Sequence, residues 1–252
     1  MSQARTAAES SAPVISVSTL TKIYGQGEVK VTALDGVSVE IPRGQMVALM
    51  GPSGSGKSTL MQVLGLLDRP TSGSYRLNGQ DLSRVSSRTM AELRGRRIAF
   101  VFQGIHLLPR LSALHNVELP MVYARVPAAE RRQRATDALN RVGVGALVHR
   151  MPNQLSGGQA QRVAIARAVA PGPDLLLADE PTGALDRASG REVLGVFQSL
   201  NQSMGLTIVM VTHDPVVGRH AERIIEMEDG RFLRDYAVDD GERIWAHQEV
   251  SA

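Results

Sequence analysis

The residue types and spacing best suited to chemistry lie in one glycine-rich segment. Gly51-Pro-Ser-Gly-Ser-Gly-Lys57-Ser58 matches the pattern G-x-x-x-x-G-K-[ST], between an apolar strand-like run and a helix-like run. Backbone amides and the positive end of the helix can then converge on phosphate oxygens. Lysine is found only at Lys22, Lys30 and Lys57, so a chance match is rare; the alternative is a Gly/Ser turn before a helix. The expected phosphate-binding residues are Gly51, Pro52, Ser53, Gly54, Ser55, Gly56, Lys57, Ser58 and Thr59.

Two adjacent carboxylates form a second candidate element. Asp179 and Glu180 follow the apolar run Leu175-Leu-Leu-Ala, and unpaired carboxylates at the end of a buried strand are costly. With the glycine-rich segment present, Lys57 is placed to bridge the β- and γ-phosphates of a nucleotide and Ser58 to hold Mg²⁺. Because successive strand residues point to opposite faces, we expect Asp179 to support Mg²⁺ and Glu180 to polarise the attacking water as general base. The alternative is an acidic turn that caps the following Pro-Thr.

Two further polar residues stand at the ends of strand-like runs. His213 follows the run from Thr207 to Thr212, and Gln103 follows the run from Ile98 to Phe102. Ligands of an open parallel sheet bind beyond the carboxyl ends of its strands. We therefore expect His213 to contact the γ-phosphate, although a lone histidine is often only a structural hydrogen-bonding residue. The amide of Gln103 can touch Mg²⁺ or water but cannot act as a base.

A second anion site is predicted at Leu155-Ser156-Gly157-Gly158-Gln159, which precedes a long helical pattern. Ser156 is a natural N-cap, and the two glycines leave bare amides at a helix N-terminus. A lone capping motif would mean little, but this chain already has one helix N-terminus for its own nucleotide. We therefore expect the second to serve the nucleotide of another copy, in a two-fold, head-to-tail homodimer with two ATP molecules at the interface.

The order of the predicted elements indicates how these residues are positioned. Runs rich in Val, Ile and Leu alternate with helical stretches, which predicts an α/β fold with a largely parallel central sheet covered on both faces. From about Leu111 to Val142 there are two helical stretches without a strand, the second from Pro127, which predicts an inserted helical lobe. No internal repeat is present, so a single cassette is expected. The strand-like runs are Ile15–Leu20, Val37–Ile41, Met46–Met50, Ile98–Phe102, Leu175–Asp179, Thr207–Val211 and Arg223–Met227.

Composition limits the class of protein. The 252 residues are 43% hydrophobic, enough for one large domain, and no run approaches the about 18 to 20 apolar residues of a membrane span. The absence of cysteine excludes disulfides, thiolate metal sites and a cysteine nucleophile. The net charge of +3 and the lack of a basic run interleaved with aromatics argue against specific nucleic-acid binding. Residues 1–14 are expected to be a disordered leader, and residues 237–252 a tail of loop or short helix.

In order and spacing, these segments resemble the Walker A, Q-loop, signature, Walker B, D-loop (Ala184-Leu-Asp186) and H-loop motifs of ABC transporter ATPases, over about residues 15–235. The resemblance implies a P-loop NTPase core with a mostly parallel central sheet, an N-terminal antiparallel β region, and a helical subdomain at about 104–165 within one ATPase domain at 15–236. It implies ATP and Mg²⁺ as ligands and Tyr24 stacked on adenine. It further implies that Ser156 and Gly158, with Gly157 and Gln159, bind the γ-phosphate in the partner, and that Asp186 links the two sites.

Finer segments resemble the lipoprotein-release and macrolide-efflux branch of the family (LolD/MacB type): YGQGEVKVTALDGVSVEI, GLLDRPTSGSYRLNG and LLPRLSALHNVELP. This resemblance implies an ATPase on the cytoplasmic face of the inner (plasma) membrane. Its partner would be a separate permease with few spans and a large extracytoplasmic domain. The chain departs from the branch at Gly104-Ile105-His106, where an aromatic residue and Asn are usual and where the family's permease docks. Ala160 and Ala184 also replace the usual Gln and Asn.

Other classes that share these motifs fit less well. A chromosome-maintenance ATPase needs a long coiled-coil insertion, for which the stretch between Gln103 and Ser156 is too short. A translation factor of the same superfamily would carry two cassettes. The alternative that stays open is a regulatory, cell-division-type ABC ATPase that signals through a membrane partner without moving cargo. Residues that bind ATP encode neither the cargo nor the direction of transport.

Overall fold

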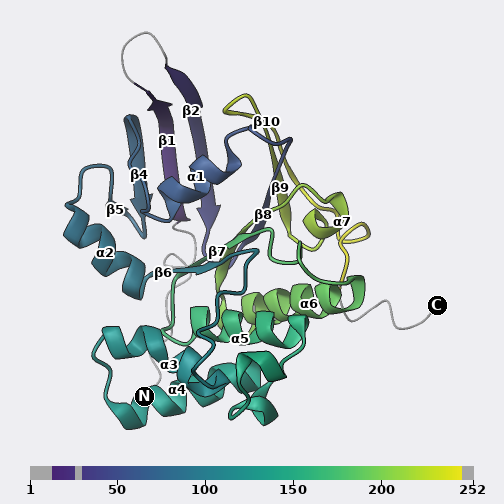
Figure 1. Ribbon diagram of the computed structural model, residues 1–252. Coiled ribbons are helices and arrows are strands. Elements are labelled where there is room, and N and C mark those ends of the chain that lie inside the picture. The colour runs from purple at the N-terminus through teal and green to yellow at the C-terminus, as the bar shows by residue number, and fades with distance from the viewer. Residues whose placement is uncertain (1–12, 26–29, 246–252) are drawn as a thin grey trace, which may run out of the picture.

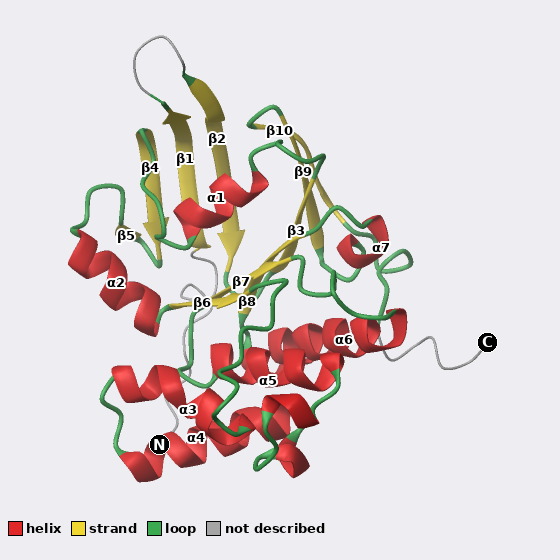
Figure 2. Ribbon diagram, in the orientation of Figure 1, coloured by secondary structure: helices red, strands yellow, loops and turns green. Residues whose placement is uncertain are grey.

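The computed structural model describes residues 13–25 and 30–245 and has an α/β architecture (Figures 1 and 2). The strands are β1 (Pro13–Tyr24), β2 (Val31–Pro42), β3 (Met46–Met50), β4 (Ser72–Leu77), β5 (Gln80–Asp81), β6 (Ile98–Val101), β7 (Leu175–Asp179), β8 (Thr207–Val211), β9 (Arg223–Glu228) and β10 (Arg231–Ala237). The α-helices are α1 (Lys57–Leu64), α2 (Ser87–Arg96), α3 (Ala113–Tyr123), α4 (Ala128–Arg141), α5 (Gly157–Val169), α6 (Arg187–Met204) and α7 (Pro215–Gly218). Two short 3₁₀ helices are η1 (Gly145–Leu147) and η2 (Pro152–Gln154).

The larger sheet has the order β10-β9-β3-β8-β7-β6 and is parallel except for β10, which runs antiparallel to β9. Its side chains alternate between two cores. In β3, Met46 and Ala48 join the core formed with α3 to α6, whereas Val47 and Leu49 join the core formed with α1 and the smaller sheet. Burial on both faces explains the continuous apolar runs, and the predicted α/β class with a mostly parallel sheet is confirmed.

The smaller sheet is the antiparallel region at the N-terminus, in the order β2-β1-β4-β5. It lies on the same side of the central sheet as α1 (Figure 1). The apolar runs predicted only parts of β1 and β2 and missed β4, β5 and β10. In β4 only Tyr75 and Leu77 are buried, and β10 is an edge strand that is mostly exposed, so neither forms an apolar run.

The segment between β6 and β7 contains helices and no strand, as predicted, and its helices α3 and α4 lie on the far side of α5 and α6 from the central sheet in Figure 1. The two helical stretches expected between residues 111 and 142 are α3 and α4. Asn116 is fully buried at the start of α3. Its amide nitrogen donates to the carbonyls of Leu108, Leu111 and Ser112, and its oxygen accepts from the amide of Leu108. These bonds satisfy backbone donors and acceptors of the loop that leads from β6 into the helices.

The two ends of the described chain pack on the core. Strand β1 begins at Pro13, two residues before the strand expected from Ile15, and the rest of the leader lies outside the described residues. After β10 the tail continues as a loop. In that loop the Ile244 carbonyl accepts a hydrogen bond from Gln198, and Arg243 pairs with Glu222 at 3.4 Å. Within residues 13–25 and 30–245, no helix combines the length and apolarity that crossing a membrane requires.

Candidate functional site

The glycine-rich loop joins the end of β3 to α1, and its backbone needs glycine at two close approaches. Gly51 has φ 146°, and a Cβ there would lie 2.1 Å from the Met227 carbonyl oxygen. Gly56, the N-cap of α1, has φ 100°, and a Cβ there would lie 2.5 Å from the Ala33 carbonyl oxygen. Both positions exclude side chains, so the loop is held tightly against β2 and β9.

Lys57 is the first residue of α1 and is buried within the loop. Its ammonium donates to the carbonyls of Gly51 at 2.8 Å and Pro52 at 2.7 Å, and to the Ser55 hydroxyl at 3.2 Å. Burial lowers the pKa of Lys57, while the nearby carboxylates of Glu180 and Asp179 act to raise it. The structure therefore brings the lysine and the acid pair together, as the sequence predicted.

Most of the rest of the loop is exposed to solvent, whereas Ser55 is buried. Pro52, Ser53, Gly54 and Ser58 are exposed, and Thr59 is partly buried in the first turn of α1. The loop therefore presents its backbone at the carboxyl end of β3, beside the start of a helix. This is the arrangement expected of a phosphate-binding loop.

Asp179 and Glu180 lie at the junction of β7 and the following turn. Asp179 is paired with Val211 of β8, and the amide of Glu180 donates to the Val211 carbonyl. Glu180 has φ 43°, in the left-handed region that non-glycine residues rarely adopt, so the chain turns sharply at this residue. Burial raises the pKa of Asp179, and the Glu180 charge raises it further, while Lys57 opposes both effects.

His213 contacts Glu180 directly. Its amide donates to Glu180 Oε1 at 3.0 Å, and its Nδ1 lies 2.6 Å from the same oxygen. Thr212 Oγ1 donates to Glu180 Oε2 at 3.2 Å, so both carboxylate oxygens are held by the end of β8. The hydrogen bond that His213 makes to the Glu180 carboxylate is the main cause of the raised pKa of His213. The sequence placed His213 at the rim of the site but did not predict this pairing.

The pairing can be tested by titrating His213. The imidazole should titrate above the usual range of a histidine, and replacing Glu180 with glutamine should return its pKa toward that range. With the folded-state pKa raised, the contact stabilises the fold most below the unfolded-state pKa and is lost as the pH rises through the folded-state value. NMR titration of the His213 ring measures this shift. An unchanged His213 pKa in the glutamine variant would show that the pair does not form.

Gln103 is exposed just beyond β6 and lies near the turn that follows Glu180. Its Nε2 would be 3.0 Å from a Cβ added to Gly183, so this glycine leaves room for the amide. The candidate site residues therefore lie at or just beyond the same carboxyl edge of the central sheet: Lys57, Asp179, Glu180, His213 and Gln103.

The signature segment lies at the start of α5. Ser156 caps this helix: its hydroxyl accepts from the Gln159 amide at 3.2 Å, while the Gln159 side chain accepts from the Ser156 amide at 3.0 Å. Ser156 and Gly157 are exposed. A Cβ on Gly158 would lie 2.9 Å from Ser189 Cβ, so this glycine allows α5 to approach α6 closely. The predicted N-cap is confirmed.

The two helix N-termini lie on different sides of the central sheet. The buried residues of α1 belong to the core beneath the smaller sheet, whereas those of α5 belong to the core of the helical side. Figure 1 shows the same separation of α1 and α5. Asp186 caps α6, with its carboxylate accepting from the amide and hydroxyl of Ser189, which lower its pKa.

Tyr24 ends β1 in a small polar network that the sequence pattern did not predict. Its hydroxyl donates to Asp68 at 2.8 Å, and Lys22 pairs with Asp68 while its Nζ lies 4.7 Å from the centre of the Tyr24 ring. Burial and the bond to Asp68 raise the pKa of Tyr24. Lys22 is one of only three lysines, and that rarity could have drawn attention to it.

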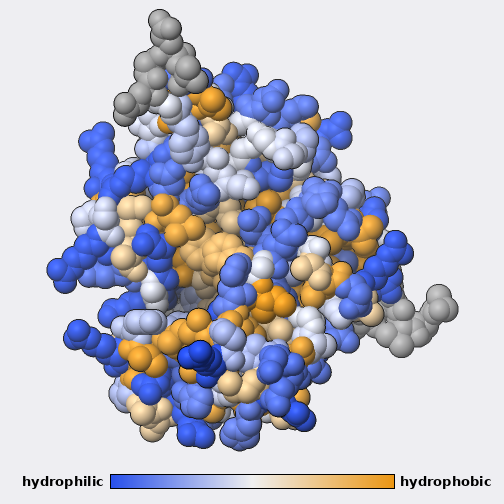
Figure 3. Space-filling model, in the orientation of Figure 1, coloured by the Kyte–Doolittle hydropathy of each residue, from blue (hydrophilic) through white to orange (hydrophobic). Residues whose placement is uncertain are grey.

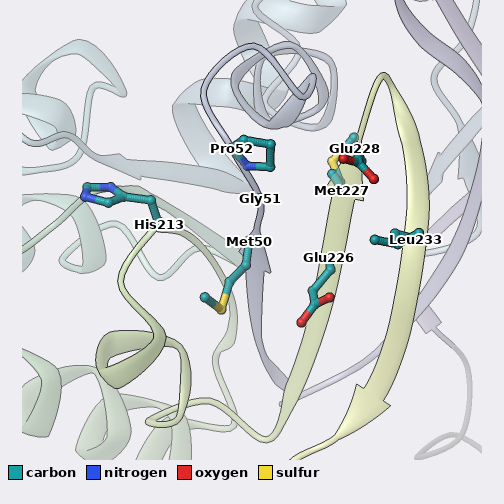
Figure 4. Close-up of a pocket in the computed structure, with 8 residues that line it drawn as sticks. All are labelled: Met50, Gly51, Pro52, His213, Glu226, Met227, Glu228 and Leu233. Atoms are coloured by element: carbon teal, nitrogen blue, oxygen red, sulfur yellow. The ribbon is translucent and has the colours of Figure 1, made fainter.

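A depression of about 350 Å³ borders the glycine-rich loop on the side of β9 and β10 (Figure 4). The His213 ring points away from Glu226 and Leu233 on its far wall. Lys57, Asp179 and Glu180 do not line this depression, but it adjoins them through Gly51, Pro52 and His213. Its lining residues are Met50, Gly51, Pro52, His213, Glu226, Met227, Glu228 and Leu233.

Comparison with known proteins agrees with this geometry. The family model for the ABC transporter matches residues 34–183. The chain is 55% identical to an uncharacterized ABC transporter ATP-binding protein of Thermotoga maritima, over 84% of the chain and 90% of that protein. It is 51% identical to the macrolide export ATP-binding/permease protein MacB of Sodalis glossinidius, over 90% of the chain but only 35% of that protein. The chain therefore spans about a third of the length of the MacB relatives.

Solved structures give the same result. The chain matches the dimeric structure of the ATP-binding cassette MJ0796 in a post-hydrolysis state with ADP and Pi, with a TM-score of 0.79 and 41% identity, covering 89% of the chain and 99% of the cassette. It also matches CbiO1 of Clostridium perfringens, part of an ABC transporter complex, with a TM-score of 0.83 and 30% identity, covering 90% of the chain and 89% of CbiO1. With a family model over more than half of its length and these relatives, the chain belongs to the ABC transporter family, whose ATP-binding cassettes hydrolyse ATP.

Proposed function

We propose that the chain binds Mg²⁺-ATP, closes with a second copy into a head-to-tail dimer, and hydrolyses ATP to drive a separate membrane permease. The observation that carries the proposal is the cluster of Lys57, Asp179, Glu180 and His213 at one edge of the sheet. A buried lysine, a partly buried carboxylate and a paired carboxylate at a phosphate-binding loop are the groups that phosphoryl transfer to water requires.

The proposal assigns a role to each of the candidate site residues. The loop from Gly51 to Thr59 holds the phosphates, with Lys57 on the β- and γ-phosphates, and Tyr24 stacks on adenine. Glu180 takes a proton from the attacking water, and His213 keeps Glu180 oriented and faces the γ-phosphate. The 2.6 Å contact between Glu180 and His213 supports this division.

The acid at the end of β7 also fits a divalent cation. No hydrogen bond to the Asp179 carboxylate occurs among the described residues, and its pKa is raised by burial and by Glu180, so a cation would relieve both costs. Asp179, Ser58 and Gln103 are the proposed Mg²⁺ ligands, directly or through water. The ion would neutralise charge that develops on the phosphates.

The dimer follows from the placement of the signature segment. Ser156 to Gln159 begin a helix on the opposite face of the sheet from α1, so in the proposal their amides serve the nucleotide of the other copy. Asp186, at the start of α6, would link the two sites. The MJ0796 cassette, which the chain resembles along most of its length, is itself dimeric.

The permease is inferred from the relatives. The chain matches about a third of MacB, a relative named as a combined ATP-binding and permease protein, and this name supports a permease as the partner of the chain. In the proposal this partner is an integral membrane protein with few spans and a large extracytoplasmic domain, and the chain acts on the cytoplasmic face of the inner membrane. An apolar surface lies between α1 and α5 and continues onto α3 (Figure 3), which would suit such a contact. A purely regulatory role, without cargo, is not favoured by these relatives.

Replacing Lys57 tests the nucleotide site. Lys57→Ala should lower turnover about 100-fold or more and weaken ATP binding, because the charge on the phosphates is lost. Lys57→Arg should fail as well, since a planar fork cannot replace a compact ammonium bonded to two loop carbonyls. Steady-state phosphate release and ATP titration measure both effects. The exposed Lys30→Arg is the matched control and should keep parental activity. Near-parental turnover in Lys57→Arg would contradict the proposed grip on phosphate.

The membrane partner is tested by purifying the tagged chain from solubilised membranes. Glu180→Gln with ATP should retain an integral membrane protein whose sequence has few spans and a large soluble domain. Isolation of the closed dimer alone, in detergents that preserve other ABC complexes, would contradict the coupling to a permease but would leave ATP hydrolysis intact.

A further inference from the structure

The loop at 104–106, directly after Gln103, is the segment that departs from the residues usual in the LolD/MacB branch. His106 has φ 45°, and its Nδ1 donates to the Gly104 carbonyl at 2.6 Å. A Cβ on Gly104 would lie 2.3 Å from the imidazole, so the ring can fold back only because residue 104 is glycine. The departures at Gly104 and His106 are therefore one feature, a closed turn beside Gln103.

Aromatic packing connects this turn to the central sheet. The His106 ring lies edge-on to Phe102, with centroids 6.3 Å apart, and Phe102 stacks on Phe100 of β6 at 5.6 Å. Such pairs are weakly stabilising. The turn is thus supported on one side by the strand that leads into Gln103.

Helix α5 holds the turn from the other side. Arg167 donates to the His106 carbonyl at 2.7 Å and to the Ile105 carbonyl at 3.3 Å. This arginine lies ten residues after the start of the helix that Ser156 caps. Burial lowers the pKa of Arg167, as expected for a partly buried guanidinium whose partners are neutral carbonyls.

A second side chain of the same helix reaches the residue before Gln103. Gln161 is buried, and its Nε2 donates to the carbonyl of Pro181 at 3.0 Å and lies 3.4 Å from that of Phe102. Pro181 directly follows Glu180. Gln161 and Arg167 therefore hold the backbone on both sides of Gln103, and Gln161 also holds the turn of the proposed base.

We propose that Gln161 and Arg167 are positioning residues that make the placement of Gln103, and through Pro181 that of Glu180, depend on the position of the signature helix. This inference rests on the proposed function, in which Ser156 at the start of α5 engages the other copy's nucleotide. When α5 moves on dimer closure, its side chains carry the loop at 102–106 with it. Contact of Ser156 with the partner's nucleotide thereby affects Gln103 and Glu180, which in the proposal bind Mg²⁺ and the attacking water at the chain's own nucleotide.

The test replaces Arg167 with methionine, which keeps an unbranched apolar stem and removes the hydrogen-bond donors. Turnover should fall at least about tenfold, because Gln103 is displaced, whereas KM and the ATP dissociation constant stay within about twofold of the parent. The Mg²⁺ concentration for half-maximal activity should rise. Arg167→Lys, which keeps one donor, should recover part of the loss, and Gln161→Met should reproduce it.

The matched control is Arg162→Met on the same helix, because Arg162 pairs with Glu192 of α6 at 3.2 Å instead of with the loop. It should keep parental turnover and Mg²⁺ dependence. Amide hydrogen exchange over residues 103–107 should quicken in Arg167→Met only. Equal losses in the two variants, a loss confined to ATP affinity, or unchanged exchange at 103–107 would overturn the inference.

The proposed function and the positioning role of Arg167 are refuted by different results. If the parent protein lacks Mg²⁺-dependent ATPase activity, the proposed function fails, and hydrogen exchange still decides whether Arg167 holds the loop. If the parent is active and Arg167→Met matches Arg162→Met, the positioning role fails and the proposed function stands.

Discussion

Replacing Glu180 with glutamine should stop ATP turnover and leave a dimer with ATP bound at the interface. The amide cannot accept a proton from water, and loss of a general base typically costs about 10²- to 10⁴-fold in rate. Its oxygen can still accept from the His213 amide, and its NH₂ can donate to Thr212, so the turn at residue 180 keeps its shape. Closure should therefore proceed while hydrolysis does not.

Size-exclusion chromatography with ATP and Mg²⁺ should shift Glu180→Gln to twice the mass of the monomer, and phosphate release should be nearly abolished. Glu228→Gln is the matched control, because Glu228 is exposed at the end of β9 close to the glycine-rich loop. It should hydrolyse ATP at the parental rate. A Glu180→Gln variant that stays monomeric, or that turns over like the parent, would refute its assignment as the base.

The sequence predicted best those parts of the fold that are buried on both sides. Strands β3, β7 and β8 are short apolar runs because each faces two cores, and the candidate site residues lie at or just after their carboxyl ends. Likewise, Ser156 was identifiable as a cap, because capping is local chemistry between residues three apart. Helix caps and strands that are buried on both faces can therefore be recognised from the sequence.

Contacts between residues that are far apart in the chain could not be predicted from the sequence pattern. The contact of His213 with Glu180 joins the ends of two neighbouring strands, and the bond from Tyr24 to Asp68 joins β1 to the segment after α1. Strand β10, being an exposed edge, has no apolar pattern. The sequence therefore predicted the candidate site residues as a set, but their hydrogen-bond partners could be found only from the three-dimensional arrangement.

Ser156→Arg tests whether the signature segment acts on the other copy's nucleotide. Ser156 is exposed at the tip of α5, so arginine there should not disturb the core, although the cap itself is weakened by about 1 kcal/mol. The variant keeps its own glycine-rich loop and should bind ATP as a monomer nearly as the parent does. It should neither dimerise nor hydrolyse ATP, because the new side chain occupies the phosphate site of the partner. Ser203→Arg, at an exposed position near the end of α6, should keep parental activity.

Mixing two inactive variants sharpens this test, because each composite site takes its loop from one chain and its signature segment from the other. In a heterodimer of Ser156→Arg with Lys57→Ala, both lesions fall at the same site and the second site is intact. The mixture should therefore recover phosphate release that neither variant shows alone, up to about half of the parental rate if each site fires independently. Parental ATPase activity in purified Ser156→Arg alone would show that the signature segment does not complete the partner's site. In that case the opposite faces occupied by α1 and α5 would need another explanation.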